Sequence, residues 1–200
     1  NSASPNVKRA SAEIVDGAGA RYVEAAVMAP VPPKRLATPI LLGGRHAAAF
    51  KSVTTGKAFV EATAFSEEVG PASAAKMCRS IIVKGLESLL AESLLTGRVY
   101  GVDEVVLASL PDLFPGLDWP RLAPYMIGRS VRHGARRADE RCEAARTVED
   151  AGLDGIMSAA TAERQSWAAQ FASAAADEDL PTMLDSILKG LPTEPRTGAR

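Results

Sequence analysis

Hydrophobic and polar positions change their pattern near residue 70. Before this point, short apolar runs alternate with helix-like or irregular stretches; the runs lie at 21–28, 38–44 and 58–65. Continuous apolar runs of this length are typical of strands that are buried on both faces of a sheet. A helix is expected over 5–17, since Ser4 suits the N-cap, Pro5 suits the first helical position and glycines follow the end. The pattern predicts an α/β arrangement.

After residue 70 the pattern is helical. The longest periodic segment is 72–96, where leucines, isoleucines and Met77 recur every three or four residues and form a wide apolar face. Prolines and glycines then divide the rest of the chain, and Gly128 is expected to separate two helices. The further helices are predicted at 102–112, 118–127, 130–151, 154–176 and 179–189.

The predicted fold class is an α/β N-terminal part followed by an all-α C-terminal domain. An α/β part of about 70 residues is smaller than a doubly wound domain, which usually has about 100–150 residues. Residues 1–69 are therefore expected to be the second half of a Rossmann-type, nucleotide-binding domain whose first half precedes Asn1. Residues 70–200 are expected to form the helical domain.

The composition narrows the classes of function. A net charge of −1 and a pI near 6.2 give no electrostatic reason to expect binding to nucleic acid or to an anionic membrane. No apolar run approaches the about 20 residues that a transmembrane helix needs. Cys78 and Cys142 lie in helix-like stretches, and neither has a histidine or a second cysteine at metal-ligand spacing. We therefore expect reduced thiols, no metal site and a cytoplasmic protein.

One side of the predicted helix 72–96 carries polar residues among aliphatic ones. Lys76, Ser80 and Lys84 recur at i, i+4 and i+8, so the two lysines lie about 12 Å apart along one face, with Glu87 one turn further. One interpretation is an ordinary solvated face. The other is a functional stripe, because a lysine partly desolvated near other cations has a lowered pKa and suits acid–base catalysis. The spacing alone leaves both open.

A basic cluster is predicted on a later helix; it consists of Arg129, Arg132, His133, Arg136 and Arg137. The favoured interpretation is a helix face whose charges are balanced by Glu140, Glu143 and Glu149. The alternative is an anion site for a carboxylate or phosphate. The stretch 17–19 contains two glycines but precedes a strand, so a helix end and turn are expected there in place of a dinucleotide-binding loop.

Three segments, in order, resemble the β-hydroxyacid dehydrogenases, which include 3-hydroxyisobutyrate, tartronate-semialdehyde and 6-phosphogluconate dehydrogenases. Gly70-Pro-Ala-Ser-Ala-Ala-Lys76 resembles the family's catalytic segment at the start of a long helix. Asn1-Ser2-Ala3-Ser4-Pro5 resembles its Ser-Thr-x-x-Pro segment. Gly19-Ala-Arg-Tyr-Val-Glu-Ala-Ala-Val27 resembles its Gly-Ala-x-aromatic-x-Asp-Ala-Pro-Val strand, and Gly43-Gly44 falls where the family's next strand ends.

The chain departs from the family pattern at two places that matter for the substrate. Where the family continues its strand with Ser-Gly-Gly, which binds the substrate carboxylate, this chain has Met28-Ala29-Pro30. Four residues after the lysine the family has asparagine, and this chain has Ser80. With these two differences and with Lys84, the chain resembles a poorly characterised branch of the family, whose C-terminal domain is like that of 6-phosphogluconate dehydrogenase.

The resemblance implies an oxidoreductase that passes a hydride between NAD or NADP and a hydroxy-acid-like substrate. Lys76 would be the general base in oxidation and the general acid in reduction, at the junction of the two domains. Ser2 would lie near the nicotinamide. The residues implied to contact the substrate are Met28, Ala29, Pro30, Ser80 and Lys84.

Two alternatives to a dehydrogenase remain open at this stage. An imine-reductase-like enzyme of the same fold would not need Lys76 in the same role, and a non-catalytic helical module would use the basic cluster instead. The apolar face of the helical domain also predicts a homodimer built through it. Because half of the cofactor site is expected to lie upstream of Asn1, residues 1–200 alone are expected to be inactive.

Overall fold

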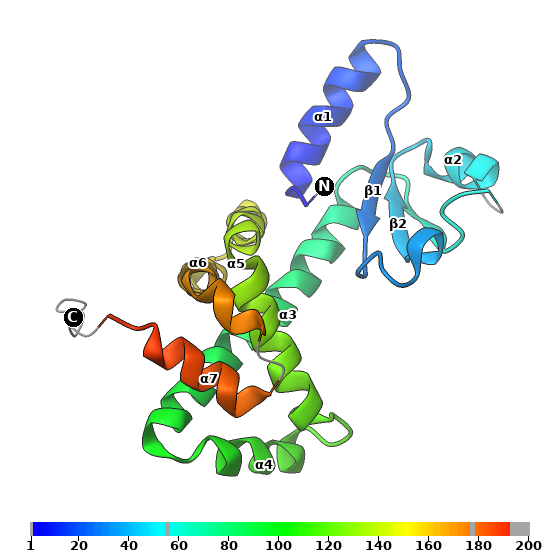
Figure 1. Ribbon diagram of the computed structural model, residues 1–200. Coiled ribbons are helices and arrows are strands. Elements are labelled where there is room, and N and C mark those ends of the chain that lie inside the picture. Colours follow the sequence, from blue (N-terminus) through cyan, green and yellow to red (C-terminus); the bar gives the residue numbers. More distant parts are fainter. Residues whose placement is uncertain (1, 55–56, 177–178, 193–200) are drawn as a thin grey trace. The chain divides into compact units, whose positions relative to one another are not determined.

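The computed structural model describes residues 2–54, 57–176 and 179–192, with helices and a small sheet first and helices alone afterwards (Figure 1). The predicted fold class, an α/β part followed by an all-α part, is confirmed. The chain forms two compact units: Asn1–Val83 with Asp139–Ala159, and Lys84–Ala138 with Ala160–Arg200. Three helices, two of them long, therefore contribute residues to both units.

The α/β part contains every element that the sequence predicts. Helix α1 is followed by a three-stranded sheet of order β1-β2-β3, in which β1 and β2 are antiparallel and β2 and β3 are parallel. Helix α2 packs on β2 and β3. The bounds are α1 Pro5–Gly17, β1 Glu24–Val27, a 3-10 turn η1 Arg35–Ala37, β2 Ile40–Gly43, α2 Ala47–Thr54 and β3 Ala62–Ser66. Side chains of β2, α2 and β3 form its small core; they are Ile40, Leu42, Ala47 and Ala62.

The remaining elements are helical. They are α3 Pro71–Tyr100, α4 Asp103–Leu113, α5 Trp119–Asp150, α6 Ile156–Ala168, a 3-10 segment η2 Ala169–Ala176 and α7 Leu180–Lys189. The helices predicted at 118–127 and 130–151 are one helix, so the joint expected at Gly128 was wrong. Gly128 lies inside the packed helical unit, where a Cβ at this position would be in ordinary van der Waals contact with the terminal methyl of Met183, at 3.4 Å. The segment predicted as one helix over 154–176 is divided into α6 and η2, with a kink at Phe171.

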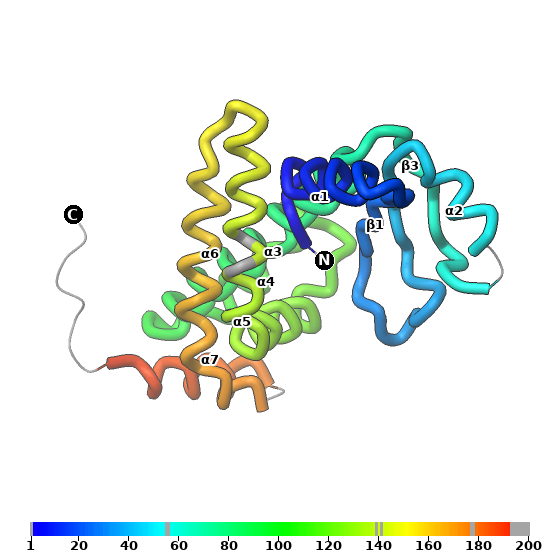
Figure 2. The backbone as a smooth tube through the Cα atoms, turned by 90° about the horizontal axis from the view of Figure 1, so that it is seen from above, coloured from blue at the N-terminus to red at the C-terminus, as the bar shows by residue number. Residues whose placement is uncertain are grey.

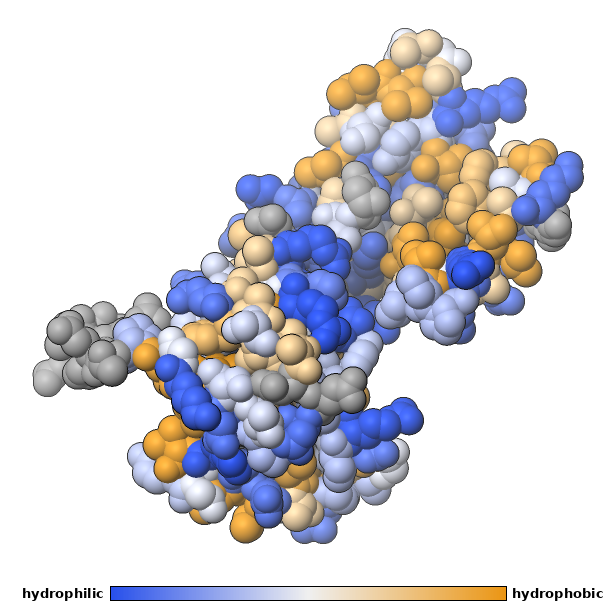
Figure 3. All heavy atoms as spheres, in the orientation of Figure 1, coloured by the Kyte–Doolittle hydropathy of each residue, from blue (hydrophilic) through white to orange (hydrophobic). Residues whose placement is uncertain are grey.

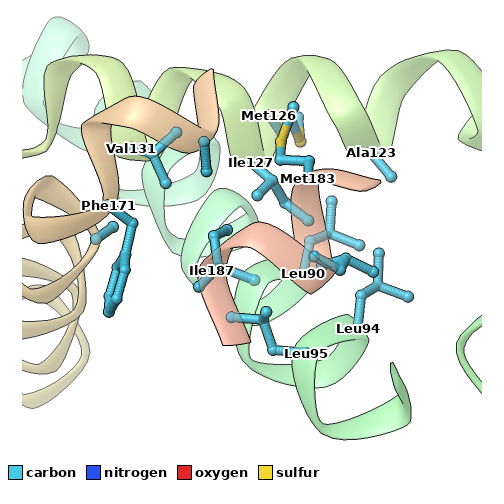
Figure 4. Packing of buried hydrophobic residues seen from close by; sticks show 14 of the residues in the cluster. Leu90, Leu94, Leu95, Ala123, Met126, Ile127, Val131, Phe171, Met183 and Ile187 are labelled. Atoms are coloured by element: carbon cyan, nitrogen blue, oxygen red, sulfur yellow. The ribbon is translucent and has the colours of Figure 1, made fainter. Parts of the chain in front are cut away.

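The core of the second unit is formed where α3, α5 and α7 meet (Figure 4). Apolar side chains at three- or four-residue spacing on each helix point into it; examples are Leu90 and Leu94 on α3, Ile127 on α5, and Leu184 and Ile187 on α7. Burial of each such side chain contributes about 1.5–3 kcal/mol. Arg98 near the end of α3 ties α7 to this core with two hydrogen bonds of 2.7 Å to the Asp185 carboxylate, and this contact lowers the pKa of Asp185.

Helices α5 and α6 form an antiparallel hairpin whose backbones approach closely (Figure 2). Gly134 on α5 faces α6, where a Cβ would collide with the carbonyl of Gln165 and come within 3.0 Å of Ala169 Cβ. Gly155 serves the same purpose near the tip, where its Cβ would lie 3.3 Å from the carbonyl of Ala145. Absence of a side chain at these positions sets the spacing of the hairpin.

Two helical glycines should therefore respond in opposite directions to the same substitution. Gly134→Ala should lower the free energy of unfolding by about 1–3 kcal/mol, because the added methyl overpacks the α5–α6 contact. Gly85→Ala should raise it by about 0.5–1 kcal/mol, since Gly85 lies inside α3 with nothing within 4 Å of the new Cβ. Urea unfolding followed by circular dichroism measures both, and equal effects would contradict this account of the hairpin.

Candidate active-site region

The start of α3 is held by a carboxylate from the sheet. Glu24 on β1 has no solvent exposure, and its two side-chain oxygens accept hydrogen bonds of 2.8 Å from the backbone N–H groups of Gly70 and Ser73. Ser73 Oγ also donates to the Gly70 carbonyl at 2.9 Å. The first N–H groups of a helix have no partner within the helix, and the helix dipole favours a negative charge there. Glu24 therefore caps α3 from outside.

The surroundings of Glu24 are built for a charged carboxylate in a tight space. A Cβ on Gly43 would lie 2.6 Å from Glu24 Oε2. With Glu24 in this position, only glycine fits at residue 43 of β2. Lys8 on α1 is 7% exposed; burial lowers its pKa, and the charge of Glu24 partly opposes that shift. Burial and the same carboxylate raise the pKa of Tyr22. A buried negative charge thus links α1, β1, β2 and α3 within one unit.

Lys76 lies on the second turn of α3, three residues after Ser73. Its side chain is half-buried, as is that of Ser80 one turn later, while Met77 beside it is buried in the protein. An ordinary solvated face, the first interpretation of this stripe, does not describe it, because Lys84 and Glu87 further along are buried, at 7% and 1% exposure. Lys76 and Ser80 are in the first unit, and Lys84 is in the second.

The segment after β1 is less enclosed. Met28 and Ala29 are half-buried, Pro30 is exposed, and the Met28 N–H donates to the Pro39 carbonyl at 2.9 Å. This segment continues directly from the strand that carries Glu24. The strand leading to Met28 and the helix carrying Lys76 are therefore joined at one carboxylate: Glu24 lies four residues before Met28, and its partner Gly70 lies six residues before Lys76.

The segment before α1 is held by a second carboxylate. The Ser4 N–H donates a hydrogen bond of 2.9 Å to Oε2 of Glu143 on α5, and Oε1 of Glu143 accepts one of 2.6 Å from Arg146. Ser4 is 2% exposed and Ser2 is half-buried. Asn1, the first residue of the motif that contains Ser2, lies outside the described residues. The turn after α1 is the expected helix end, in which Gly19 has φ +77° and its N–H donates to the Asp16 carbonyl.

The basic cluster on α5 is divided between the interior and the surface. Arg137, at 1% exposure, forms an ion pair with Glu87 of the stripe, and Arg129 Nε lies 3.8 Å from the same carboxylate. Arg132 donates to the carbonyl of Ala175 at 2.8 Å. His133 lies at the surface. Its pKa is lowered, first by the loss of part of its hydration and then by the positive charges of the nearby arginines. Part of the cluster is thus an internal charge network of the helical unit.

Sequence reasoning did not identify Glu24 and Glu143 as organising residues. Glu24 had a detectable signal, because it is the acid inside an otherwise apolar run that resembles a family strand with aspartate at this place. Glu143 had none, since it was one of several glutamates on a charged helix. Within the described residues, no group of three or more His, Cys, Asp or Glu side chains is arranged to hold a metal ion. None of the described helices has the length and apolar character needed to cross a membrane.

Comparison with known proteins places this fold. Residues 98–168 match the model of a domain of unknown function, DUF1932. A conserved hypothetical protein from Sinorhizobium meliloti 1021 superposes with a TM-score of 0.75 and 35% identity, over 96% of this chain and 64% of its own. The conserved protein MTH1747 of unknown function, whose structure revealed similarity with 3-hydroxyacid dehydrogenases, superposes with a TM-score of 0.70 and 26% identity, over 94% of this chain and 65% of its own.

The chain is therefore similar, over most of its length, to a protein whose structure revealed similarity with 3-hydroxyacid dehydrogenases. The resemblance inferred from three short motifs is thereby confirmed. The chain spans slightly less than two thirds of the length of both relatives, 64% and 65%. None of the curated proteins matches it significantly.

Replacement of Glu24 tests whether its charge holds α3. Glu24→Gln should lower the free energy of unfolding by about 1–3 kcal/mol, because the amide NH2 would face a backbone donor and leave one buried N–H without an acceptor. The matched control is Glu67→Gln, at an exposed position, which should change stability by less than about 0.5 kcal/mol. Urea unfolding of both variants measures the difference; a Glu24→Gln protein as stable as the control would contradict the capping role.

Proposed function

We propose that the protein is an NAD(P)-dependent oxidoreductase that transfers a hydride between the nicotinamide and a hydroxy-acid-like substrate. The observation that carries the proposal is the position of Lys76. It is half-buried on the second turn of a helix whose start is fixed by the fully buried Glu24. A chain of hydroxyacid-dehydrogenase-like fold with a lysine so placed has what acid–base work on a substrate hydroxyl requires.

Lys76 would handle the proton. During oxidation, its neutral amine takes the proton of the substrate hydroxyl. A hydride leaves the carbon that carries this hydroxyl, so that a C=O bond replaces the C–O single bond. In reduction the ammonium returns that proton to the oxygen. The nicotinamide supplies the hydride chemistry. The half-buried position of Lys76 supports the role, because a side chain held by its surroundings is better placed for proton transfer than one that moves freely in solvent.

Substrate contacts are proposed for the residues around this lysine. The hydroxyl of Ser80, one turn after Lys76 and half-buried like it, would hydrogen-bond the reacting oxygen. Met28, Ala29 and Pro30 would line the pocket, with fewer hydrogen-bond donors than the Ser-Gly-Gly that they replace. This difference favours a less polar group on the substrate. Lys84 stays a predicted substrate contact, and its side chain is buried.

The described residues fit only one end of a dinucleotide. Ser2 would contact the nicotinamide end; it is half-buried and directly precedes the buried Ala3, Ser4 and Pro5. The glycines at 17–19 end a helix and do not form a phosphate-binding loop. A Cβ on Gly43 would meet the side chain of Glu24, so this glycine makes room for the protein itself. The phosphates of NAD or NADP would therefore be bound by residues outside this chain.

We also propose that residues 1–69 are part of a larger nucleotide-binding domain. Figure 3 shows hydrophobic residues gathered on the surface over the α/β part. Large apolar side chains there are exposed although the local core is small; they are Val31, Leu36, Val53, Phe59, Val60 and Phe65. Both solved relatives are about half as long again as this chain, which supports a further segment that would cover such a surface.

Replacement of Lys76 tests the proposed chemistry in the full-length protein. Lys76→Ala should leave the Kd for NADH or NADPH nearly unchanged, because the lysine acts on the substrate oxygen. Turnover of a hydroxy-acid substrate should fall by roughly 10²–10⁴-fold. Lys76→Arg should be almost as damaging, since a guanidinium does not give up its proton near neutral pH.

Arg79→Ala is the matched control, because Arg79 lies on the same helix with an exposed side chain. This control should keep its turnover. If Lys76→Ala retains most of its activity, Lys76 is a structural residue, and Lys84 on the same stripe becomes the next catalytic candidate. A wild-type protein that binds neither NADH nor NADPH would end the proposal of an oxidoreductase.

A homodimer built through the helical part is proposed as well. A shallow groove of about 450 Å³ runs along α3 and α4, and its lining includes Leu89, Tyr100 and Val102. Leu89, Tyr100 and Val102 are exposed by 57%, 77% and 42%. Apolar surface of this kind is typical of contacts between subunits.

A cytoplasmic location stays a prediction; both cysteines are free and exposed.

The dimer prediction has a direct test. The protein should elute as a dimer at micromolar concentration when its mass is measured by light scattering. Leu89→Glu should shift it toward the monomer, because a carboxylate would be buried without a partner in the contact. Ile14→Glu, at an exposed apolar position on α1, should leave the dimer intact. A monomeric wild-type protein would contradict the prediction.

A further inference from the structure

We infer that Glu143 is a positioning residue for the nicotinamide end of the cofactor, acting through the segment that leads into α1. The inference rests on the proposed function, because Ser2 is its link to the cofactor. It goes beyond that function by assigning a role to a residue of α5, a helix that none of the proposed site residues belongs to.

The start of α1 lacks the usual means of fixing a helix N-terminus. Ser4 occupies the N-cap position, but its side chain makes no capping hydrogen bond. Pro5 at the first position has no N–H, and the first turn contains no acidic residue. The helix dipole therefore meets no negative charge from α1 itself.

Glu143 supplies what α1 lacks. Its Oε2 accepts the hydrogen bond from the Ser4 N–H at 2.9 Å, which brings a carboxylate to the positive end of the helix. The side chain of Glu143 is only 19% exposed, so this charge is poorly screened by solvent. The residue lies 139 positions away in sequence, so the contact depends on the folded protein and not on local structure.

Glu143 is itself held in place. Arg146 donates to its other oxygen at 2.6 Å, and the Thr147 hydroxyl donates to its backbone carbonyl at 2.8 Å. The neighbouring Ala144 is fully buried, and Ala145 is in close contact with Gly155 at the tip of the α5–α6 hairpin. A carboxylate on such a support fixes the group that it binds.

The held segment leads directly to Ser2. Ala3 and Ser4 are 8% and 2% exposed, and Pro5 is buried. Ser2 is half-buried, and only two peptide bonds separate it from Ser4, whose N–H is held by Glu143. Release of Ser4 would therefore let Ser2 take many orientations. A ligand that needs one of them would bind more weakly, because it must then order this segment on binding.

The test measures cofactor affinity and local protection in the full-length protein. Glu143→Ala should raise the Kd for NADH or NADPH by about five- to tenfold, a change that corresponds to the loss of one helix cap. Hydrogen exchange at the amides of Ser4 and of residues 6–8 should become faster in the same variant. Glu143→Gln keeps one oxygen acceptor but loses the charge, and its NH2 must face either the Ser4 N–H or Arg146, so its Kd should lie between those of the wild type and Glu143→Ala.

Two further variants keep the result interpretable. Glu149→Ala removes an exposed carboxylate from the same helix and should change neither the Kd nor the exchange. If Glu143→Ala does not fold, Arg146→Ala serves in its place; Arg146 is 64% exposed, and its loss should loosen Glu143 and raise the Kd by about twofold.

The outcomes separate the inference from the function on which it rests. Weaker cofactor binding with faster exchange in Glu143→Ala, and a smaller effect of both kinds in Glu143→Gln, supports the inference. If the wild-type protein binds the cofactor and Glu143→Ala binds it equally well, the inference is overturned, whether or not the exchange changes, and the proposed function stands. If the wild-type protein binds neither cofactor, the proposed function is wrong and this inference falls with it.

Discussion

The buried carboxylate of Glu24 is the interaction on which the first unit depends. A charge without solvent exposure is costly to bury unless it is paired or hydrogen-bonded. Here two backbone N–H groups at the start of α3 and the nearby Lys8 compensate for that cost. The same contact aligns a 30-residue helix with a four-residue strand. This anchor fixes the start of the helix that carries Lys76 on its second turn.

Charges inside the helical unit have a different effect. Glu87 and Arg137 are each 1% exposed and pair with one another, and Arg129 lies close to the same carboxylate. Gln165 on α6 reaches Ser130 on α5 at 3.1 Å nearby. Aliphatic side chains would pack in many registers, whereas polar groups that must meet a partner restrict the helices to one. The apolar core supplies the driving force for packing, and this network contributes specificity.

Hydrophobic periodicity was enough to predict the order of elements and the change from α/β to all-α structure, because strands and helices bury faces of different period. It was not enough at Gly128, where glycine suggested a break but lies inside one helix, next to Met183. The candidate lysine was recognisable because Lys76 lies in a motif, whereas Glu143 acts on a residue 139 positions away. Such contacts arise only from tertiary packing, which single-sequence patterns do not contain.

The close approach of Gly43 to Glu24 has a consequence for how this sequence can diverge. A Cβ at position 43 would lie 2.6 Å from Glu24 Oε2, and the long glutamate fills the space that a side chain on β2 would need. The family strand that this segment resembles has the shorter aspartate at the place of Glu24. The two positions are therefore coupled: shortening the acid at 24 would remove the worse of the two collisions of an alanine at 43 and leave the contact of 3.0 Å with the Glu68 carbonyl. A change at 43 is thus more costly before a change at 24 than after it, even though neither residue reacts with a substrate.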